Sequence, residues 1–512
     1  MTAADGDGVS CALCHRMVDP VYKSGVSPTN DLAILAALSF PGTNYGNGMF
    51  VIDSTGTRRG PFTDAAAGHT FLASPFHSRS EFCGTCHDVS NPEFQNDGAG
   101  HYNANALNTT ATNFSPHFMA PVERTFSEWS NSEYNSTNGV LAPQFAGNKP
   151  GGRVSSCQDC HMRDVAGYGC NTNLNAGVPW RTNLPLHDLT GGSTWLPGLL
   201  TNLFPSDVNV TAIQSGIARA TQLLTNAASL ALADAGNELR VTVTNECGHK
   251  LPTGYPEGRR VWLNMKFYDE PGNLLGESGA YNSTNGVLTR DNKAKIYEVH
   301  PGIETNLAAA LGLLPGPSLH FVLNNQTYED NRIPPRGFTN ANFAAFGGSP
   351  VGHSYADGQY WDDSLYTLPA GATRAEVKLY YQSTSKEFVE FLRDENRTTA
   401  HGQAIYDLWA TNGMCPPTLI GERTWVIAFQ MTAATMTLQG KFRMEFLARP
   451  GLNYTVEFKN SLADTAWQTF SANGTIMATN TLCSVEDDFS ANTSGGASPT
   501  GQRYYRFRYS AP

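Results

Sequence analysis

The chain has 512 residues and a formal net charge of −11, and charged residues make up 15% of it. A chain of this charge lacks the clustered basic face that nucleic-acid binding requires, so we expect no nucleic-acid partner. No run of about 18 apolar residues occurs, which predicts no transmembrane segment. The length is typical of two to four domains, and the 49 glycines and 29 prolines predict abundant loops.

Three copies of the pattern Cys-x-x-Cys-His lie in the first third of the chain, as CALCH, CGTCH and CQDCH. This pattern is typical of c-type haem attachment. The two thiols add to the vinyl groups of one porphyrin, and the histidine binds the iron from one face. The sequence therefore predicts three covalently attached haem c groups with their iron. The attachment residues are Cys11, Cys14, His15, Cys83, Cys86, His87, Cys157, Cys160 and His161.

Zinc and a redox dithiol are the alternative interpretations of these motifs. A structural zinc site uses four ligands from neighbouring pairs, whereas these pairs lie about 70 residues apart and each has its own histidine. A redox dithiol needs no histidine and would not recur three times. Covalent haem attachment takes place outside the bacterial cytoplasm, so we expect a periplasmic or extracellular protein. The start, MTAADGDGVSC, lacks the features of a signal peptide, so we expect the chain to begin inside a longer precursor.

Each iron has a second axial position, and ten histidines lie outside the three motifs. A haem with two histidine ligands has a low potential and suits electron transfer. His77 lies ten residues before the histidine of the second motif, while His187 and His249 lie in turn-rich stretches where backbone can approach a porphyrin closely. Met119 is a methionine alternative. The candidate distal ligands are His69, His77, His117, His187 and His249.

The remaining sequence divides into three predicted parts and an α+β fold class. Residues 1–205 show little apolar periodicity, so we expect short helices and loops packed on haem. Residues 206–440 begin with a predicted helix over 206–234, and alternating stretches such as LRVTVTN and AEVKLYYQS then predict a β-sandwich-like domain. A helical segment at 386–413 is inserted in it. Residues 441–512 predict a small antiparallel β domain.

Four cysteines lie outside the motifs, and in an oxidising compartment they could form two disulfides. Three pairings are open, and the sequence alone does not choose among them. These cysteines are Cys170, Cys247, Cys415 and Cys483.

Several longer phrases complete the pattern over roughly residues 1–440: SRSEFCGTCHDVSNP, LPLHDLTGG, GHKLPTGYPEGRRVWL and EFLRDENRT. With these phrases the chain resembles a family of exported bacterial multihaem c-type cytochromes. The resemblance implies electron transfer with redox partner proteins or neighbouring cytochrome subunits, and it favours His187 and His249 as haem ligands. Members of the family generally carry further haem motifs upstream, so the resemblance implies either that the chain is the later part of a larger cytochrome or that it has lost its first haems. The cysteine of NECGH is unusual for the family, and a disulfide from Cys247 would explain it.

We therefore expect a multihaem cytochrome that carries single electrons outside the cytoplasm. In one variant of this hypothesis, it works within a larger or filamentous haem assembly. The sequence leaves a homo-oligomer open and offers no dedicated cluster of catalytic residues. The first alternative is a multihaem oxidoreductase with one open-coordination haem that acts on a small substrate, such as a nitrogen or sulfur oxyanion. The second is a cell-surface binding or scaffold protein.

Overall fold

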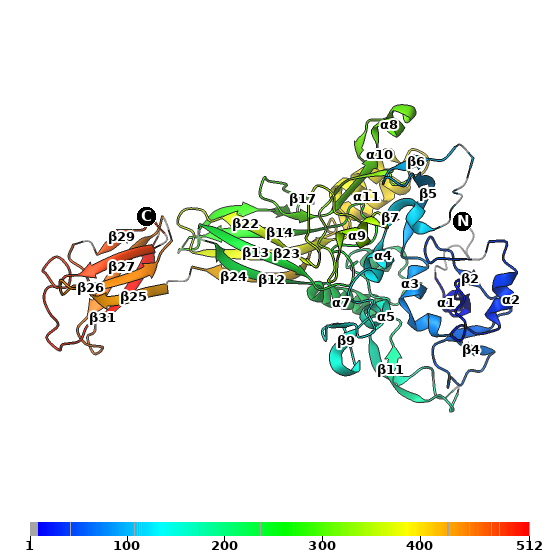
Figure 1. Ribbon diagram of the computed structural model, residues 1–512, viewed down its shortest axis with the longest axis horizontal. Helices are drawn as coiled ribbons and strands as arrows, with labels where there is room; N and C mark the ends of the chain where they lie inside the picture. Colours follow the sequence, from blue (N-terminus) through cyan, green and yellow to red (C-terminus); the bar gives the residue numbers. More distant parts are fainter. Residues whose placement is uncertain are drawn as a thin grey trace.

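The computed structural model describes residues 9–510, except positions 41, 107, 110, 112, 114, 174, 236, 270, 428, 429, 450, 473 and 481. Figure 1 shows an elongated molecule, with the N-terminal third at one end, a layered β region in the middle and the C-terminal strands at the other end. Short helices and many small sheets alternate along the chain, which confirms the predicted α+β class. The division after residues 205 and 440 stays a prediction. No helix within the described ranges has the length and apolar character needed to cross a bilayer.

The N-terminal third is built from short elements, as its weak periodicity predicts, but small sheets join the helices. Its described sheets have two or three strands. Buried charge holds parts of it together: Arg59 is fully buried and pairs with Asp31 (2.6 Å) and Asp53 (2.8 Å). The helices are α1 (Cys11–Arg16), α2 (Asp31–Ala36), α3 (Ser80–Gly84), α4 (Thr125–Ser130), α5 (Cys157–His161) and α6 (Leu196–Leu203). The strands are β1 (Met17–Val18), β2 (Val51–Ile52), β3 (Arg58–Gly60), β4 (Phe71–Ala73), β5 (Val89–Asn96), β6 (Tyr102–Ala104), β7 (Met119–Glu123), β8 (Val140–Leu141), β9 (Arg153–Val154), β10 (Asp164–Tyr168) and β11 (Trp180–Pro185).

Two antiparallel sheets pack face to face in the middle of the chain, with strand orders β12-β13-β22 and β15-β14-β23-β24. Smaller sheets and helices fill the connections. The strands of the two main sheets are β12 (Ala228–Ala235), β13 (Glu238–Asn245), β14 (Arg260–Tyr268), β15 (Leu274–Ser278), β22 (Trp361–Thr367), β23 (Arg374–Gln382) and β24 (Thr418–Val426). The connecting elements are β16 (Tyr281–Asn282), β17 (Val287–Leu288), β18 (Ile296–Tyr297), β19 (Val299–Ile303), α8 (Thr305–Leu311), β20 (Gly316–Pro317), β21 (Gln326–Asp330) and α9 (Asn340–Ala344).

The alternation of apolar residues along β13 explains how this strand faces the core. Leu239, Val241 and Val243 are fully buried between the sheets, and each such side chain stabilises the fold by about 1.5–3 kcal/mol. β14 is buried on both faces, because Trp262 packs with Leu288 on the side away from that core.

The structure differs from two helix predictions. The helix expected over 206–234 is α7 (Val210–Ala227), which begins after Asn209, whose side chain caps it (3.0 Å to the amide of Ala212). The prediction is wrong for residues 206–209, which precede α7, and for residues 228–234, which belong to β12 and pair with β13. The segment at 386–413 is two helices, α10 (Lys386–Glu395) and α11 (His401–Thr411), because the chain becomes extended at Asn396.

The C-terminal strands form a small antiparallel unit, as predicted. One sheet has the order β25-β26-β30, and in the other β27 pairs with β28, β29 and β31. Met444, Phe446, Tyr454 and Val456 are buried between them. The strands are β25 (Gln430–Met436), β26 (Phe442–Leu447), β27 (Asn453–Lys459), β28 (Gln468–Thr469), β29 (Thr475–Met477), β30 (Leu482–Asp487) and β31 (Tyr504–Ser510).

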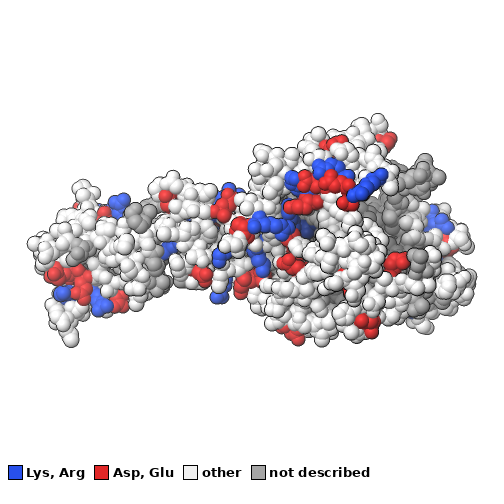
Figure 2. Space-filling model, turned by 90° about the horizontal axis from the view of Figure 1, so that it is seen from above, with Lys and Arg blue, Asp and Glu red and all other residues white. Residues whose placement is uncertain are grey.

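The charged side chains on the face in Figure 2 are of both signs and lie intermingled, with wide uncharged areas between them. No extended basic patch is visible on that face.

Candidate metal centres in the N-terminal third

Each predicted attachment motif starts on a short helix. α1 is capped by the hydroxyl of Ser10, and α5 by a capping box in which Ser156 and Asp159 exchange hydrogen bonds (3.2 and 3.0 Å). In the second motif α3 ends at Gly84, and the amides of Cys86 and His87 then bond to the carbonyl of Cys83. Residues three and four apart share one side of such a turn, so in each motif the chain presents its chemical groups together.

The imidazoles of the first and third motifs are held in the same way. Nδ1 of His15 lies 2.7 Å from the carbonyl oxygen of Arg59, and Nδ1 of His161 lies 2.5 Å from that of Thr190. Each Nδ1–H therefore donates to a backbone carbonyl, which leaves Nε2 with its lone pair free. A metal-binding histidine is usually oriented by this kind of hydrogen bond.

The imidazole of the second motif has a different partner. Nδ1 of His87 lies 3.3 Å from the carboxylate oxygen Oε1 of Glu123, which is 6% exposed. This hydrogen bond raises the pKa of His87. The imidazole itself is 65% exposed. His87 thus also keeps Nε2 free, but its orienting group is a buried carboxylate.

Two of the three motif histidines face a second imidazole. The ring centroids of His161 and His249 are 6.4 Å apart, and those of His15 and His187 are 6.0 Å apart. An imidazole nitrogen binds a transition metal at about 2 Å and the ring centre lies about 1 Å further on, so two axial imidazoles place their centroids about 6 Å apart. Both pairs therefore have the separation that a metal bound between them requires. Within the described residues, no second imidazole faces His87 in this way.

His77 also lies near His15, with ring centroids 5.8 Å apart. Nε2 of His77 lies 2.9 Å from the carbonyl oxygen of Cys14, which belongs to the helix that carries His15, so Nε2–H donates to that carbonyl. Nδ1 of His77 is buried and has no hydrogen-bond partner among the described residues. Two imidazoles, those of His77 and His187, therefore lie near His15, and the family resemblance favours His187 of the two.

The remaining candidates do not face a motif histidine. His69 is exposed, and its Nδ1 lies 3.1 Å from the carbonyl oxygen of the next residue. Nε2 of His117 lies 2.7 Å from the hydroxyl of Ser127. Met119 is buried, and its sulfur accepts a hydrogen bond from the amide of Asn47 (3.7 Å).

The second and third motifs lie close together. The amide of Cys157 donates to the hydroxyl of Ser80 in α3 (3.0 Å), and Gln158 donates to the carbonyl of Arg79 (2.8 Å). Groups attached to the second and third motifs would therefore be neighbours.

Burial keeps the imidazoles of His161 and His249 neutral. It lowers the pKa of His161 to about 4 and also lowers that of His249. A neutral imidazole is the form that binds metal. A cavity of about 190 Å³ adjoins His161, and its lining includes Phe145, Leu223, Arg163 and Arg219. The lining mixes these apolar side chains with polar ones, and Arg163 and Arg219 both pair there with Asp188 (3.6 and 3.2 Å).

His249 reaches the third centre from the connection between β13 and β14. Its Nδ1 lies 3.0 Å from the carbonyl oxygen of Lys250, whose amide donates to Glu128 of α4 (3.0 Å). The buried ammonium of Lys250 pairs with Asp330 (2.7 Å), which also pairs with Arg332. Burial alone would raise the pKa of Asp330, but Arg332 and Lys250 outweigh it and lower that pKa to about 2. The hydrogen bond from Lys250 to Glu128 joins this connection to α4 of the N-terminal third, next to His249.

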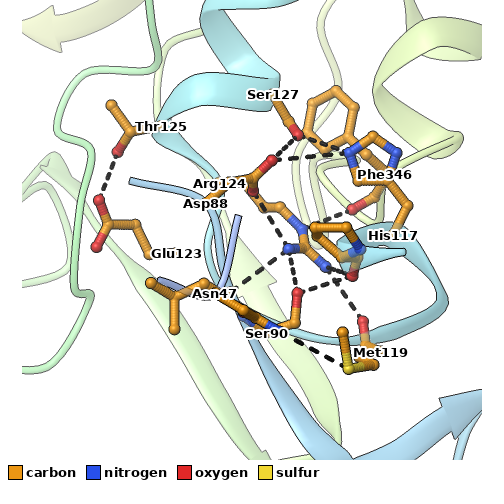
Figure 3. Close-up of polar contacts among 12 residues, drawn as sticks. Asn47, Asp88, Ser90, His117, Met119, Glu123, Arg124, Thr125, Ser127 and Phe346 are labelled. Atoms are coloured by element: carbon orange, nitrogen blue, oxygen red, sulfur yellow. Dashed lines mark hydrogen bonds and ion pairs between the residues drawn. The ribbon is translucent and has the colours of Figure 1, made fainter. Parts of the chain in front are cut away.

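Arg124 organises the region around the second motif, and Figure 3 shows its guanidinium at the centre of a polar network. It donates to Asp88, the residue after His87 (3.3 Å), and to the hydroxyl of Ser90 (2.6 Å). It also donates to the carbonyls of Val89, Pro116, Met119 and Phe346. Arg124 is 5% exposed and Asp88 is 1% exposed. Arg124 and Glu123 were not among the site residues predicted from the sequence, because their roles depend on the pairing of β5 with β7.

All ten cysteines lie in the described part of the chain, and all are free thiols there. The disulfides expected from the four cysteines outside the motifs are therefore absent from the structure. They do not pair because they lie in different parts of the fold. Cys170 is exposed in the N-terminal third, and Cys247 follows β13. Cys415 is buried near Trp409, and Cys483 lies in the C-terminal sheet.

No family model matches the chain, and no curated protein matches it. Among solved structures, the chain is similar to a penta-haem cytochrome c552 from Thermochromatium tepidum. The identity is 16% and the TM-score is 0.42, over 82% of this chain and 77% of that chain. That protein is described as penta-haem, whereas this chain has three Cys-x-x-Cys-His motifs.

Proposed function

We propose that this protein is a multihaem c-type cytochrome that passes single electrons between redox partners outside the cytoplasm. The single observation that carries the proposal is the geometry of the motif histidines. All three are oriented through Nδ1 with Nε2 free, and His15 and His161 each face a second imidazole at about 6 Å. Zinc attached to scattered thiols and a redox dithiol do not require this arrangement.

In the proposal the chain holds three haem c groups through its motif cysteines. His15 and His187 would hold the first iron, and His161 and His249 would hold the third. His87 would hold the second iron. When bound, haem supplies an iron that cycles between two oxidation states and so accepts and releases one electron.

The protein's own contribution is to orient, bury and space these groups. The carbonyls of Arg59 and Thr190 fix the first and third imidazoles in the tautomer that leaves Nε2 free. Contact between the second and third motifs keeps two centres adjacent, which favours rapid electron transfer between them. The chain's partners would be redox proteins or neighbouring cytochrome subunits, and a periplasmic or extracellular location follows from covalent haem attachment.

One observation favours a second candidate function, a multihaem oxidoreductase with an open coordination position. Within the described residues His87 faces no second imidazole, whereas His15 and His161 do. A haem with one histidine ligand is able to bind a small substrate on its free face.

Spectroscopy of the mature protein separates the two functions. The carrier function predicts low-spin ferric signals in electron paramagnetic resonance for all haems and no reaction of the reduced protein with carbon monoxide. The oxidoreductase predicts one high-spin haem that binds carbon monoxide or cyanide. Absence of reduction by one-electron donors would contradict both functions.

A further inference from the structure

The three motif histidines differ in the group that receives their Nδ1 hydrogen bond. His15 and His161 donate to neutral backbone carbonyls. His87 donates to the carboxylate of Glu123 over 3.3 Å. The three motifs are otherwise alike in sequence pattern and in their helical start, so this partner is the feature that sets the second centre apart.

Glu123 is held beside Nδ1 of His87 by the fold and not by a flexible surface contact. Glu123 is the last residue of β7, and in the register of β5 and β7 it lies opposite Val89, two residues after His87. The hydroxyl of Thr125 donates to the same carboxylate oxygen, Oε1 (3.1 Å), and is itself paired with Thr253 (2.9 Å). Figure 3 shows the contact between Thr125 and Glu123. The carboxylate is thus held by its backbone strand and by one neutral donor.

No lysine or arginine of the described chain forms an ion pair with Glu123, although it is 6% exposed. Its neighbour Arg124 turns away, towards Asp88 and the carbonyl of Phe346. Water and salt screen a charge in such a position much less than a surface charge. The imidazole of His87 therefore lies beside a negative group that forms no ion pair with a lysine or arginine of the described chain.

A carboxylate that accepts the Nδ1 hydrogen bond changes the metal bound at Nε2 in two ways. It draws the proton away from the ring and so makes the imidazole a more basic ligand. It also places negative charge near the metal, which favours the oxidation state of higher positive charge. Both effects stabilise ferric iron, and hydrogen bonding to ligands is one of the means by which proteins set haem potentials.

We propose that Glu123 is a positioning residue that lowers the reduction potential of the second centre, relative to the same centre with a neutral hydrogen-bond acceptor. This inference rests on the proposed attachment of haem to Cys83, Cys86 and His87. Glu123 sets the second haem apart from the first and third, and it does so by contact with the ligand His87 and not with the haem itself.

The test compares variants of the full-length mature protein by spectroelectrochemical titration. Glu123→Gln keeps an oxygen acceptor but removes the charge, so we expect one of three potentials to rise while the other two stay. Thr125→Val removes a donor that partly neutralises the carboxylate, so we expect a smaller shift of the same potential downwards. Glu93→Gln is the matched control, because it removes an equal charge from an exposed position of β5 and should move no potential.

The ferric signal of one haem in electron paramagnetic resonance should change in Glu123→Gln and stay unchanged in Glu93→Gln. Unchanged potentials in Glu123→Gln, or equal shifts of all three, would overturn the inference. If Glu123→Gln does not mature, Thr125→Val decides: a downward shift of one potential supports the inference and no shift overturns it. A wild-type chain without attached haem would instead defeat the proposed function, and intact mass measured first keeps the two failures apart.

Discussion

Replacement of Arg124 by methionine tests whether the buried network beside the second motif is structural. Arg124 donates six hydrogen bonds, and its partner Asp88 is almost completely buried. Methionine keeps much of the apolar volume but leaves the Asp88 carboxylate without its cation. Removing one partner of a buried ion pair costs about 3–5 kcal/mol, and the carbonyls that lose a donor add to this.

The effect should be local, because Arg124 ties β5, β7 and the carbonyl of Phe346 together. Hydrogen exchange read by mass spectrometry reports such local opening in a chain of several parts. We expect amides in residues 89–96 and 119–123 to exchange as though opening were easier by about 3–5 kcal/mol. Arg153→Met is the control, since Arg153 is exposed and makes one backbone hydrogen bond, to Asn138. It should change exchange by no more than about 0.5 kcal/mol.

A second substitution tests whether the lost protection comes from the uncompensated charge of Asp88. Adding Asp88→Asn to Arg124→Met removes the uncompensated charge, so part of the lost protection should return. The reasoning fails if Arg124→Met leaves exchange within about 1 kcal/mol of the parent chain, or if Asp88→Asn deepens the loss.

Three further predictions follow from the other contacts. His249→Ala should convert one low-spin haem to a high-spin haem that binds carbon monoxide, whereas His69→Ala should leave the spectrum unchanged; the same spectrum for both variants would remove His249 as a ligand. The pKa of Asp330 falls from 3.8 to about 2 on folding, so its stabilisation is complete above pH about 4 and lost as the pH falls to about 2. Acid unfolding of Asp330→Asn followed by circular dichroism should therefore be flatter over this range, and an unchanged slope would contradict the assignment. Ser156→Ala should destabilise α5 locally by about 1 kcal/mol through loss of its cap, measured as faster exchange of residues 157–161; unaltered exchange would show that the cap contributes little.

The three motifs are readable from the sequence, whereas the contacts that support them are not. Pattern and spacing identify the three motifs, because attachment chemistry fixes which residues must be adjacent. The turn-rich setting and the family resemblance singled out His187 and His249, and the structure brings both opposite motif histidines. His77 was an equal candidate from sequence, and its bond to the carbonyl of Cys14 could not be foreseen.

Features that depend on the pairing of segments far apart in the chain could not be predicted from the sequence. Glu123 and Arg124 look like ordinary strand-end residues until β5 pairs with β7. The stretch at 228–235 is rich in alanine, which fits a helix as well as a strand, and its full-length pairing with β13 decides the outcome. The α+β class itself was predictable, because it needs only the sum of local periodicities.

Intact mass of the mature polypeptide tests the central claim most directly. The polypeptide should be heavier than its amino-acid sequence by three haem groups that survive denaturation, since each is bound through two thioethers. Peptides that contain CALCH, CGTCH and CQDCH should each carry one of them. A mass equal to that of the bare polypeptide, from cells that attach haem to other cytochromes, would contradict the claim.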